Sequence, residues 1–204
     1  MQLFNSSSAK KIFTHTWYIY PIGALLLSLI WIWAFPTYHQ PTKHQTISIF
    51  FAAEVKDDSF LKNIQSNYER EKLREVTPSY CMPDATVFGQ KMKIANSYAD
   101  ILVINETVFK RYESQYSDLF AEIDSNMKEN YFKDNSYYTS SGKDYAVLLK
   151  SKDVTSKLED YLLMENENYY LCFAVGSNNL GKSNSPENEY YDNALTFAQY
   201  LLEI

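Results

Sequence analysis

Histidine is absent from most of this 204-residue chain, because its three copies, His15, His39 and His44, all lie within the first 44 residues. Residues 45–204 therefore cannot form a Ser-His-Asp triad, a Cys-His pair, a histidine-containing zinc site or a histidine general base. We expect a non-enzymatic domain that holds no metal and no cofactor.

Glycine, proline and cysteine are also scarce, with five, six and two copies. So little Gly and Pro argues against a turn-rich β-sandwich or a linker-like chain. Two thiols cannot make a four-cysteine metal site, so Cys81 and Cys172 are either buried and unpaired or joined in one disulfide in an oxidising exterior. The 46% of hydrophobic residues, by contrast, suffices for one folded core.

Acidic residues are missing from residues 1–44, which contain Lys10, Lys11 and Lys43. The rest of the chain has 16 Lys and Arg against 25 Asp and Glu, a net charge of −9. Because binding to nucleic acid depends on a basic face, we expect no nucleic-acid partner.

Residues 17–35 contain no charge, and as a helix these 19 residues would span roughly 28 Å, about one bilayer. Aromatic residues gather at both ends of this stretch, as in the aromatic belts of membrane helices. A cleaved signal peptide has the same basic-then-apolar order, but its apolar core is usually shorter and ends in a small-x-small motif. The segment Trp33-Ala34-Phe35-Pro36 lacks that motif.

Lys10 and Lys11 precede the apolar segment, which by the positive-inside tendency places the N-terminus in the cytoplasm. The sequence thus predicts a single-pass protein of the cell membrane. Its expected parts are a cytoplasmic N-terminus at 1–16, a transmembrane helix at 17–36, a stalk at 37–45 and an extracellular domain at 46–204.

Within the domain, apolar runs alternate with segments of helical periodicity, which indicates an α/β fold with a mostly parallel sheet and helices on both faces. We expect one sheet of about five strands, with 46–53 and 99–104 as central neighbours and no second hinged lobe. Residues 124–144 are Tyr-rich and not assigned. The expected extended segments are 46–53, 73–82, 99–104, 145–149 and 169–175, and the expected helices are 60–68, 85–95, 107–123, 155–164 and 190–202.

The segment Gly176–Ser183 satisfies the phosphate-loop pattern G-x-x-x-x-G-K-S. A nucleotide site would need a helix that begins at Lys182, yet the chain continues with turn-forming residues and Pro186. An ordinary loop is the favoured interpretation, and a phosphate-loop enzyme is the third-ranked alternative for function.

Polar residues follow the ends of three predicted strands, where ligands collect in open α/β sheets. The alternative is that these are ordinary polar loops. The Tyr-rich stretch from Tyr131 to Tyr145 could likewise line a groove, although cover for the core is the favoured interpretation. The candidate ligand-binding residues at the strand ends are Glu54, Asn105, Glu106, Ser177, Asn178 and Asn179.

Four segments together resemble the extracellular solute-binding proteins of bacterial ABC transporters, in their type 2 periplasmic-binding class: TISIFFAAE, DDSFLKNIQSNYE, ADILVINETVF and YYLCFAVGSNNLG. More narrowly, they look like small membrane-anchored members from low-GC Gram-positive bacteria. The resemblance covers residues 46–123 and 142–204, and implies that Glu54, Asn105, Glu106 and Ser177 face a ligand cleft. Members of the class have two lobes, whereas about 160 residues hold one lobe and a fragment.

The leading hypothesis is therefore a membrane-tethered domain, similar to solute-binding proteins, that recognises a ligand or a partner protein at the outer membrane face. The alternative is an interaction module for an ABC transporter or another membrane or cell-envelope protein, without small-molecule binding. A cavity beside the strand-end residues would favour the first, and a large exposed apolar patch the second.

Overall fold

A computed structural model of the chain describes residues 17–68, 73–177, 179–180 and 192–204. Contacts between residues divide the chain into two units, Met1–Gln40 and Pro41–Ile204. Each unit is described by itself.

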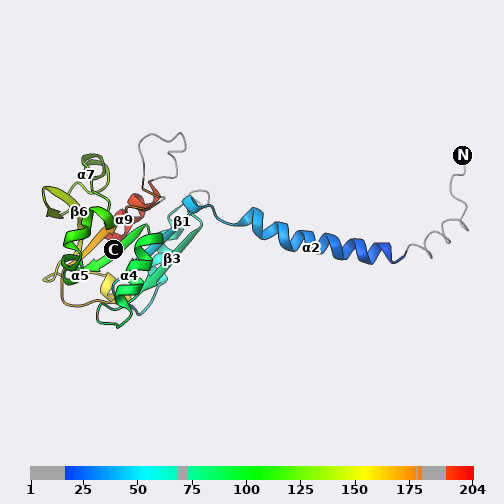
Figure 1. Cartoon of the computed structure of the whole chain (residues 1–204), viewed down its shortest axis with the longest axis horizontal. Coiled ribbons are helices and arrows are strands. Elements are labelled where there is room, and N and C mark those ends of the chain that lie inside the picture. The colour runs from blue at the N-terminus through cyan, green and yellow to red at the C-terminus, as the bar shows by residue number, and fades with distance from the viewer. Residues whose placement is uncertain (1–16, 69–72, 178, 181–191) are drawn as a thin grey trace, which may run out of the picture. The chain divides into compact units, whose positions relative to one another are not determined.

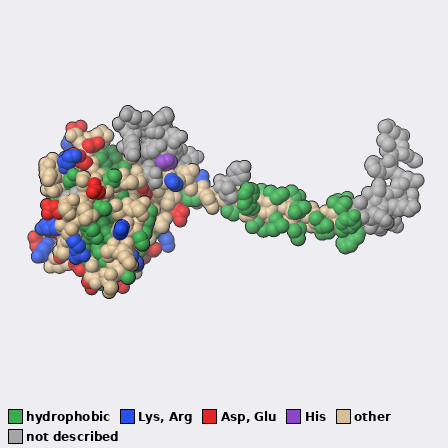
Figure 2. Space-filling model, in the orientation of Figure 1, with side chains coloured by type: hydrophobic (Ala, Val, Ile, Leu, Met, Phe, Trp, Pro, Cys, Tyr) green, Lys and Arg blue, Asp and Glu red, His purple; other side chains and the backbone are tan. Residues whose placement is uncertain are grey.

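The first unit contains one long helix, α2, at Ile19–His39 (Figure 1). None of its most apolar segment, Ile19–Pro36, is buried, and Figure 2 shows an almost continuous hydrophobic surface along it. Ser28 satisfies its hydroxyl by donating to the carbonyl of Ala24 one turn earlier, so it does not interrupt the apolar face. The helix is long and apolar enough to cross a membrane, a length and composition that it shares with signal sequences.

The second unit is built on a six-stranded sheet in the order β3-β1-β4-β8-β6-β5. Strand β1 pairs in parallel with β3 and with β4, whereas the pairs β4–β8, β8–β6 and β6–β5 are antiparallel. The sheet is therefore mixed, with two parallel and three antiparallel strand pairs. The strands are β1 (Thr46–Phe51), β3 (Glu75–Tyr80), β4 (Ile101–Asn105), β5 (Tyr137–Ser140), β6 (Lys143–Lys150) and β8 (Tyr169–Phe173).

Alternate side chains of the central strands point to opposite faces, and each face has its own apolar core. One face packs against α3 (Ser59–Ser66), α7 (Ser125–Tyr131), α8 (Leu158–Tyr161) and α9 (Asn193–Glu203). The other packs against α4 (Phe88–Tyr98) and α5 (Glu106–Arg111), which lie on the near side of the sheet in Figure 1. All residues of β4 and β8 are buried, which explains their uninterrupted apolar sequences.

The expected helix at 107–123 is broken, which corrects the sequence prediction. Helix α5 ends at Arg111, a 3-10 turn follows at Glu113–Gln115, and α6 covers only Tyr116–Leu119. Phe120 then forms a β-bridge with Ala174, and its ring stacks 5.4 Å from that of Phe109. Extending the chain at Phe120 thus buries an aromatic ring that a continuous helix would carry elsewhere.

The expected helix at 155–164 also ends early, because α8 gives way to β7 at Leu162–Leu163. Strand β7 pairs with β2, Glu54–Val55, in a separate two-stranded ribbon. The N–H groups of Lys56 and Asp57 both donate to the carbonyl of Tyr161, which fixes the chain at this crossing. The unassigned stretch 124–144 contains α7 and β5.

The predicted α/β fold, with one main sheet between two layers of helices, is confirmed. Strands β1 and β4 are neighbours as expected, and within the described residues the only other sheet is the ribbon of β2 and β7. The parallel part is smaller than the sequence suggested, since β8, β6 and β5 run antiparallel to their neighbours. Both cysteines are buried and free, which decides between the two alternatives left open above.

Candidate functional site

The strand-end candidates do not come together, because they occupy opposite ends of the sheet. Strands β1 and β4 are parallel, so Glu54 and the pair Asn105 and Glu106 follow them at one end. Strand β8 runs the other way, and Ser177 and Asn179 follow it at the end where β1 and β4 begin. The expectation of one shared binding edge is therefore wrong. Asn178, also a candidate, lies outside the described residues.

At the first end, the side chain of Asn105 is already used in holding the fold. Asn105 is 1% exposed, and its Oδ1 accepts the N–H of Val108 at 3.0 Å, which makes it the N-cap of α5 in place of the expected Thr107. Its amide nitrogen donates to Glu165 at 2.5 Å. Both polar atoms of this 1% exposed side chain are therefore engaged within the fold.

Glu106 is occupied in the same way by the loop that precedes β8. Its carboxylate accepts from Lys110 at 2.5 Å and from the Asn168 amide at 2.7 Å. Glu167 of the same loop accepts from the N–H and hydroxyl of Thr107 at 3.1 and 2.8 Å. The loop therefore covers this end of β4. Glu54 is exposed in β2 and contributes backbone pairing with Leu163.

At the opposite end, Ser177 and Asn179 tie three strands together. The Ser177 hydroxyl donates to Asp100 at 2.6 Å and accepts from the N–H of Asn179 at 3.1 Å. The Asn179 amide donates to the carbonyl of Thr46, the first residue of β1, at 2.9 Å. These contacts point to a structural role for both residues. Lys182 and Ser183 of the phosphate-loop pattern lie outside the described residues.

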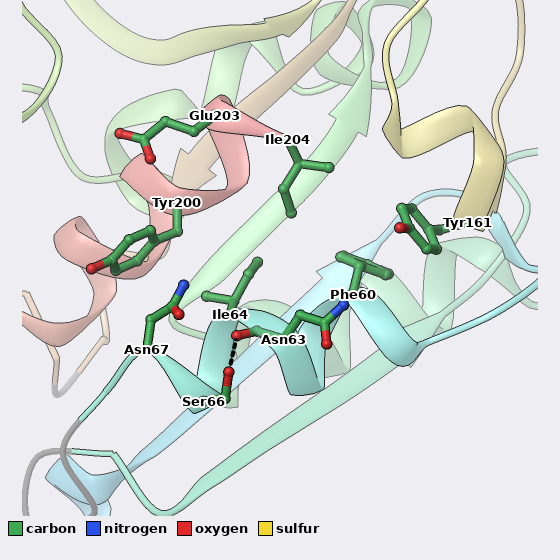
Figure 3. A pocket seen from close by; sticks show the side chains of 9 residues that line it. All are labelled: Phe60, Asn63, Ile64, Ser66, Asn67, Tyr161, Tyr200, Glu203 and Ile204. Carbon is green, nitrogen blue, oxygen red and sulfur yellow. Dashed lines mark hydrogen bonds between the residues drawn. The ribbon is translucent and has the colours of Figure 1, made fainter.

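The structure instead shows a groove of about 450 Å³ between α3, α8 and α9, on the face of the sheet opposite α4 and α5. Figure 3 shows the Tyr200 ring beside the Asn67 amide at one part of the groove, and Tyr161 beside Phe60 at another. The lining residues are Phe60, Asn63, Ile64, Ser66, Asn67, Tyr161, Tyr200, Glu203 and Ile204.

Packing fixes the aromatic walls of this groove. The Tyr161 ring lies 5.2 Å from that of the buried Phe60, and the Tyr200 ring lies 5.6 Å from that of Tyr68. Phe60 and Ile64 are 1% and 3% exposed and anchor α3 in the core. Both tyrosines are therefore supported from behind while part of each side chain remains accessible.

Three polar side chains of the groove are free to bind. The side-chain amides of Asn63 and Asn67 and the carboxylate of Glu203 are exposed, and none of them bonds to another described residue. Each amide can both donate and accept hydrogen bonds. The described lining contains no Lys or Arg. Aromatic faces beside amides suit an uncharged polar ligand with one apolar side, such as a saccharide or a peptide segment.

No local pattern in the sequence signals this groove, because its walls come from α3, α8 and α9, which are far apart along the chain. The Tyr-rich stretch does not line it. Phe132 and Tyr145 are buried, and Tyr131, Tyr137 and Tyr138 pack against the two cores, as the favoured interpretation expected. Among the described residues, no group of three His, Cys, Asp or Glu side chains could hold a metal ion.

No protein-family model and no curated protein matches the sequence. Two crystal structures of the N-glycan transport solute-binding protein NgtS from Streptococcus pneumoniae are similar to part of the chain, one of them in complex with Man1GlcNAc. Identities are 18% and 19%, TM-scores are 0.37 and 0.30, and each match covers 52% of this chain. The matches span 25% of NgtS. Likeness at this level says nothing about ligand or mechanism.

Proposed function

We propose that this chain is a membrane-anchored, non-enzymatic binding protein, in which α2 spans the cell membrane and the α/β domain, outside the cytoplasm, recognises a ligand in the groove between α3, α8 and α9. The uncharged length of α2 supports the anchor. Lys10 and Lys11 before it, against Lys43 alone after it, support a cytoplasmic N-terminus.

The observation that carries the binding role is the set of unpaired polar groups over a rigid aromatic wall. The side chains of Asn105, Glu106 and Ser177 form hydrogen bonds within the fold. Those of Asn63, Asn67 and Glu203 bond to no described residue. A ligand that hydrogen-bonds to these groups and stacks on Tyr200 would gain contacts without displacing any bond of the folded protein. The lack of histidine in residues 45–204 supports a role without catalysis.

The test is a thermal-shift screen of the detergent-solubilised full chain against neutral oligosaccharides and neutral tripeptides. A ligand at 100 times its Kd adds about 2.7 kcal/mol of stability, which raises the Tm of a domain of this size by about 5–10 °C. Asn67→Ala and Tyr200→Ala should abolish the shift, and Tyr98→Ala, an exposed tyrosine on the opposite face, should retain it. A shift that the groove variants leave unchanged, or no shift with any compound, contradicts the proposal.

A second candidate is that the groove holds a segment of another membrane protein, such as an ABC transporter or a cell-envelope protein. The open α3 wall, where Asn63, Ser66 and Asn67 are all exposed, favours an extended occupant that continues beyond the groove. A photo-crosslinking residue at position 67 should then capture one membrane protein in intact cells, and the same residue at exposed position 126 of α7 should not.

A further inference from the structure

Exposed apolar side chains of the domain are concentrated on one helix. In the described part of Pro41–Ile204, seven large hydrophobic side chains are exposed, and three of them belong to α4 and its N-cap. Val87, Ile94 and Tyr98 are 48%, 59% and 47% exposed. Their spacing of seven and four residues places them on one stripe along the helix, and Lys91 falls on the same stripe.

These four residues, Val87, Lys91, Ile94 and Tyr98, are called the α4 stripe, and the last three of them line a second groove of about 370 Å³. The groove lies between α4 and the edge strand β3, and Phe50, Pro78 and Tyr80 also line it. The Tyr98 hydroxyl donates to Ser79 at 3.2 Å, and the Lys91 amine donates to the carbonyl of Tyr80 at 3.5 Å. The stripe is therefore held on a rigid base, with its apolar surface turned outward.

The local charge of this flank differs from that of the domain. Residues 75–99, which cover β3 and α4, contain Lys91 and Lys93 against Glu75 and Asp84 and so carry no net charge, whereas residues 45–204 together carry a net charge of −9. Figure 2 shows hydrophobic side chains at the surface beside Lys or Arg side chains over the region of α4. An anionic surface is repelled by most of the domain, and this flank is where it could approach.

The position of α4 near the start of β1 indicates that the anionic surface is the membrane itself. The N–H of Asp100, two residues after Tyr98, donates to Ser48 of β1 at 2.8 Å, so the end of α4 lies near the start of β1. Only Gln40, Pro41 and Thr42 separate α2 from the 3-10 turn Lys43–Gln45 before β1. Three extended residues reach roughly 10 Å. If α2 spans a membrane, this end of the domain stays close to lipid headgroups.

We propose that the α4 stripe and the groove beside β3 form a surface by which the domain rests on anionic phospholipid of the membrane that holds α2. Ile94, Val87 and Tyr98 enter the headgroup region, and Lys91 contacts phosphate while its aliphatic stem covers apolar surface. This inference rests on the anchoring role proposed for α2. It does not depend on a ligand in the groove between α3, α8 and α9.

The test uses the full chain in lipid nanodiscs, with an environment-sensitive fluorophore on Ser97→Cys of α4 and, separately, on Val154→Cys. Residue 154 follows β6 at the end of the sheet away from the start of β1. Labelling is selective because both native cysteines are buried. A nitroxide on the lipid headgroup should quench the fluorophore at 97 but not at 154, and more strongly with phosphatidylglycerol than with phosphatidylcholine alone.

Matched variants test the chemistry. Lys91→Gln should lower the ratio of docked to free domain about five-fold, as expected for the loss of one charge near the membrane surface. Ile94→Glu should abolish quenching at 97, whereas Lys152→Gln and Val154→Glu, at exposed positions on the other end, should change nothing. Equal quenching at 97 and 154, or quenching that survives Ile94→Glu, overturns the inference.

An alkaline wash of vesicles distinguishes a failure of the proposed membrane span from a failure of the α4 inference. A chain that the wash releases contradicts the membrane span and this inference together. A chain that the wash retains, without quenching at 97, contradicts this inference alone.

Discussion

Asp100 offers a sharp test of the role assigned to the end of the sheet that holds Ser177. Its side chain is 4% exposed, and its carboxylate accepts the N–H of Ser48 at 2.9 Å and the hydroxyl of Ser177 at 2.6 Å. These two bonds join the start of β4 to β1 and to the turn after β8. Asp100→Ala leaves two donors without their acceptor.

The size of the effect follows from the two bonds. A hydrogen bond to a charged group contributes about 1.5–3 kcal/mol, and removing the carboxylate also removes its own burial cost, so we expect a loss of about 3 kcal/mol. For a domain of this size that lowers Tm by about 6–12 °C. Asp100→Asn keeps the shape, since its oxygen can accept from Ser48 and its nitrogen can donate to the Ser177 oxygen. It should cost about 1 kcal/mol, or about 2–4 °C.

Differential scanning calorimetry of the full chain in detergent measures both variants, with the exposed Asp153→Ala as the control that should leave Tm unchanged. Equal losses for Asp100→Ala and Asp100→Asn would show that the carboxylate's hydrogen bonds are not the source of the stability. A loss below about 1 kcal/mol for Asp100→Ala would refute the assigned role outright.

Three further predictions concern charge, thiols and topology. The hydrogen bond from Lys110 lowers the pKa of Glu106 against the opposing effect of burial, with a further contribution from Asn168. Because the folded-state pKa lies below the usual 4.5, this stabilisation is fully present above that pH and is lost as the pH falls through the lowered pKa, so the Tm difference between wild type and Glu106→Gln should shrink progressively on acidification from pH 4.5. Burial raises the pKa of the Cys172 thiol and Cys81 is 7% exposed, so a thiol reagent should modify neither cysteine in the folded chain; rapid modification of either would contradict the described core. Protease added to intact cells should remove the domain and leave residues 1–16 protected, whereas a fully protected domain would reverse the proposed orientation.

The local elements could be predicted where a pattern of apolar residues decides them. The runs around Ile49, Leu102 and Leu171 are buried on both faces, so their sequences carry the signal of a central strand whatever their neighbours are. The helical periodicity before Leu201 likewise predicted α9, and the uncharged stretch 17–35 predicted α2. In each case the partner of the element matters less than its own hydrophobicity.

Strand direction and the meeting of distant segments were decided only by the tertiary structure. A five-residue apolar strand looks the same whether it joins its neighbour in parallel or antiparallel, so nothing local showed that β8 runs opposite to β4 and carries Ser177 away from Asn105. The break at Phe120 depends on packing against Phe109 and pairing with Ala174, neither of which is encoded in the helical periodicity of 107–123. The groove exists because α3, α8 and α9 pack on one face of the sheet. No local sequence pattern predicts that Asn67, Tyr161 and Tyr200 line the same groove.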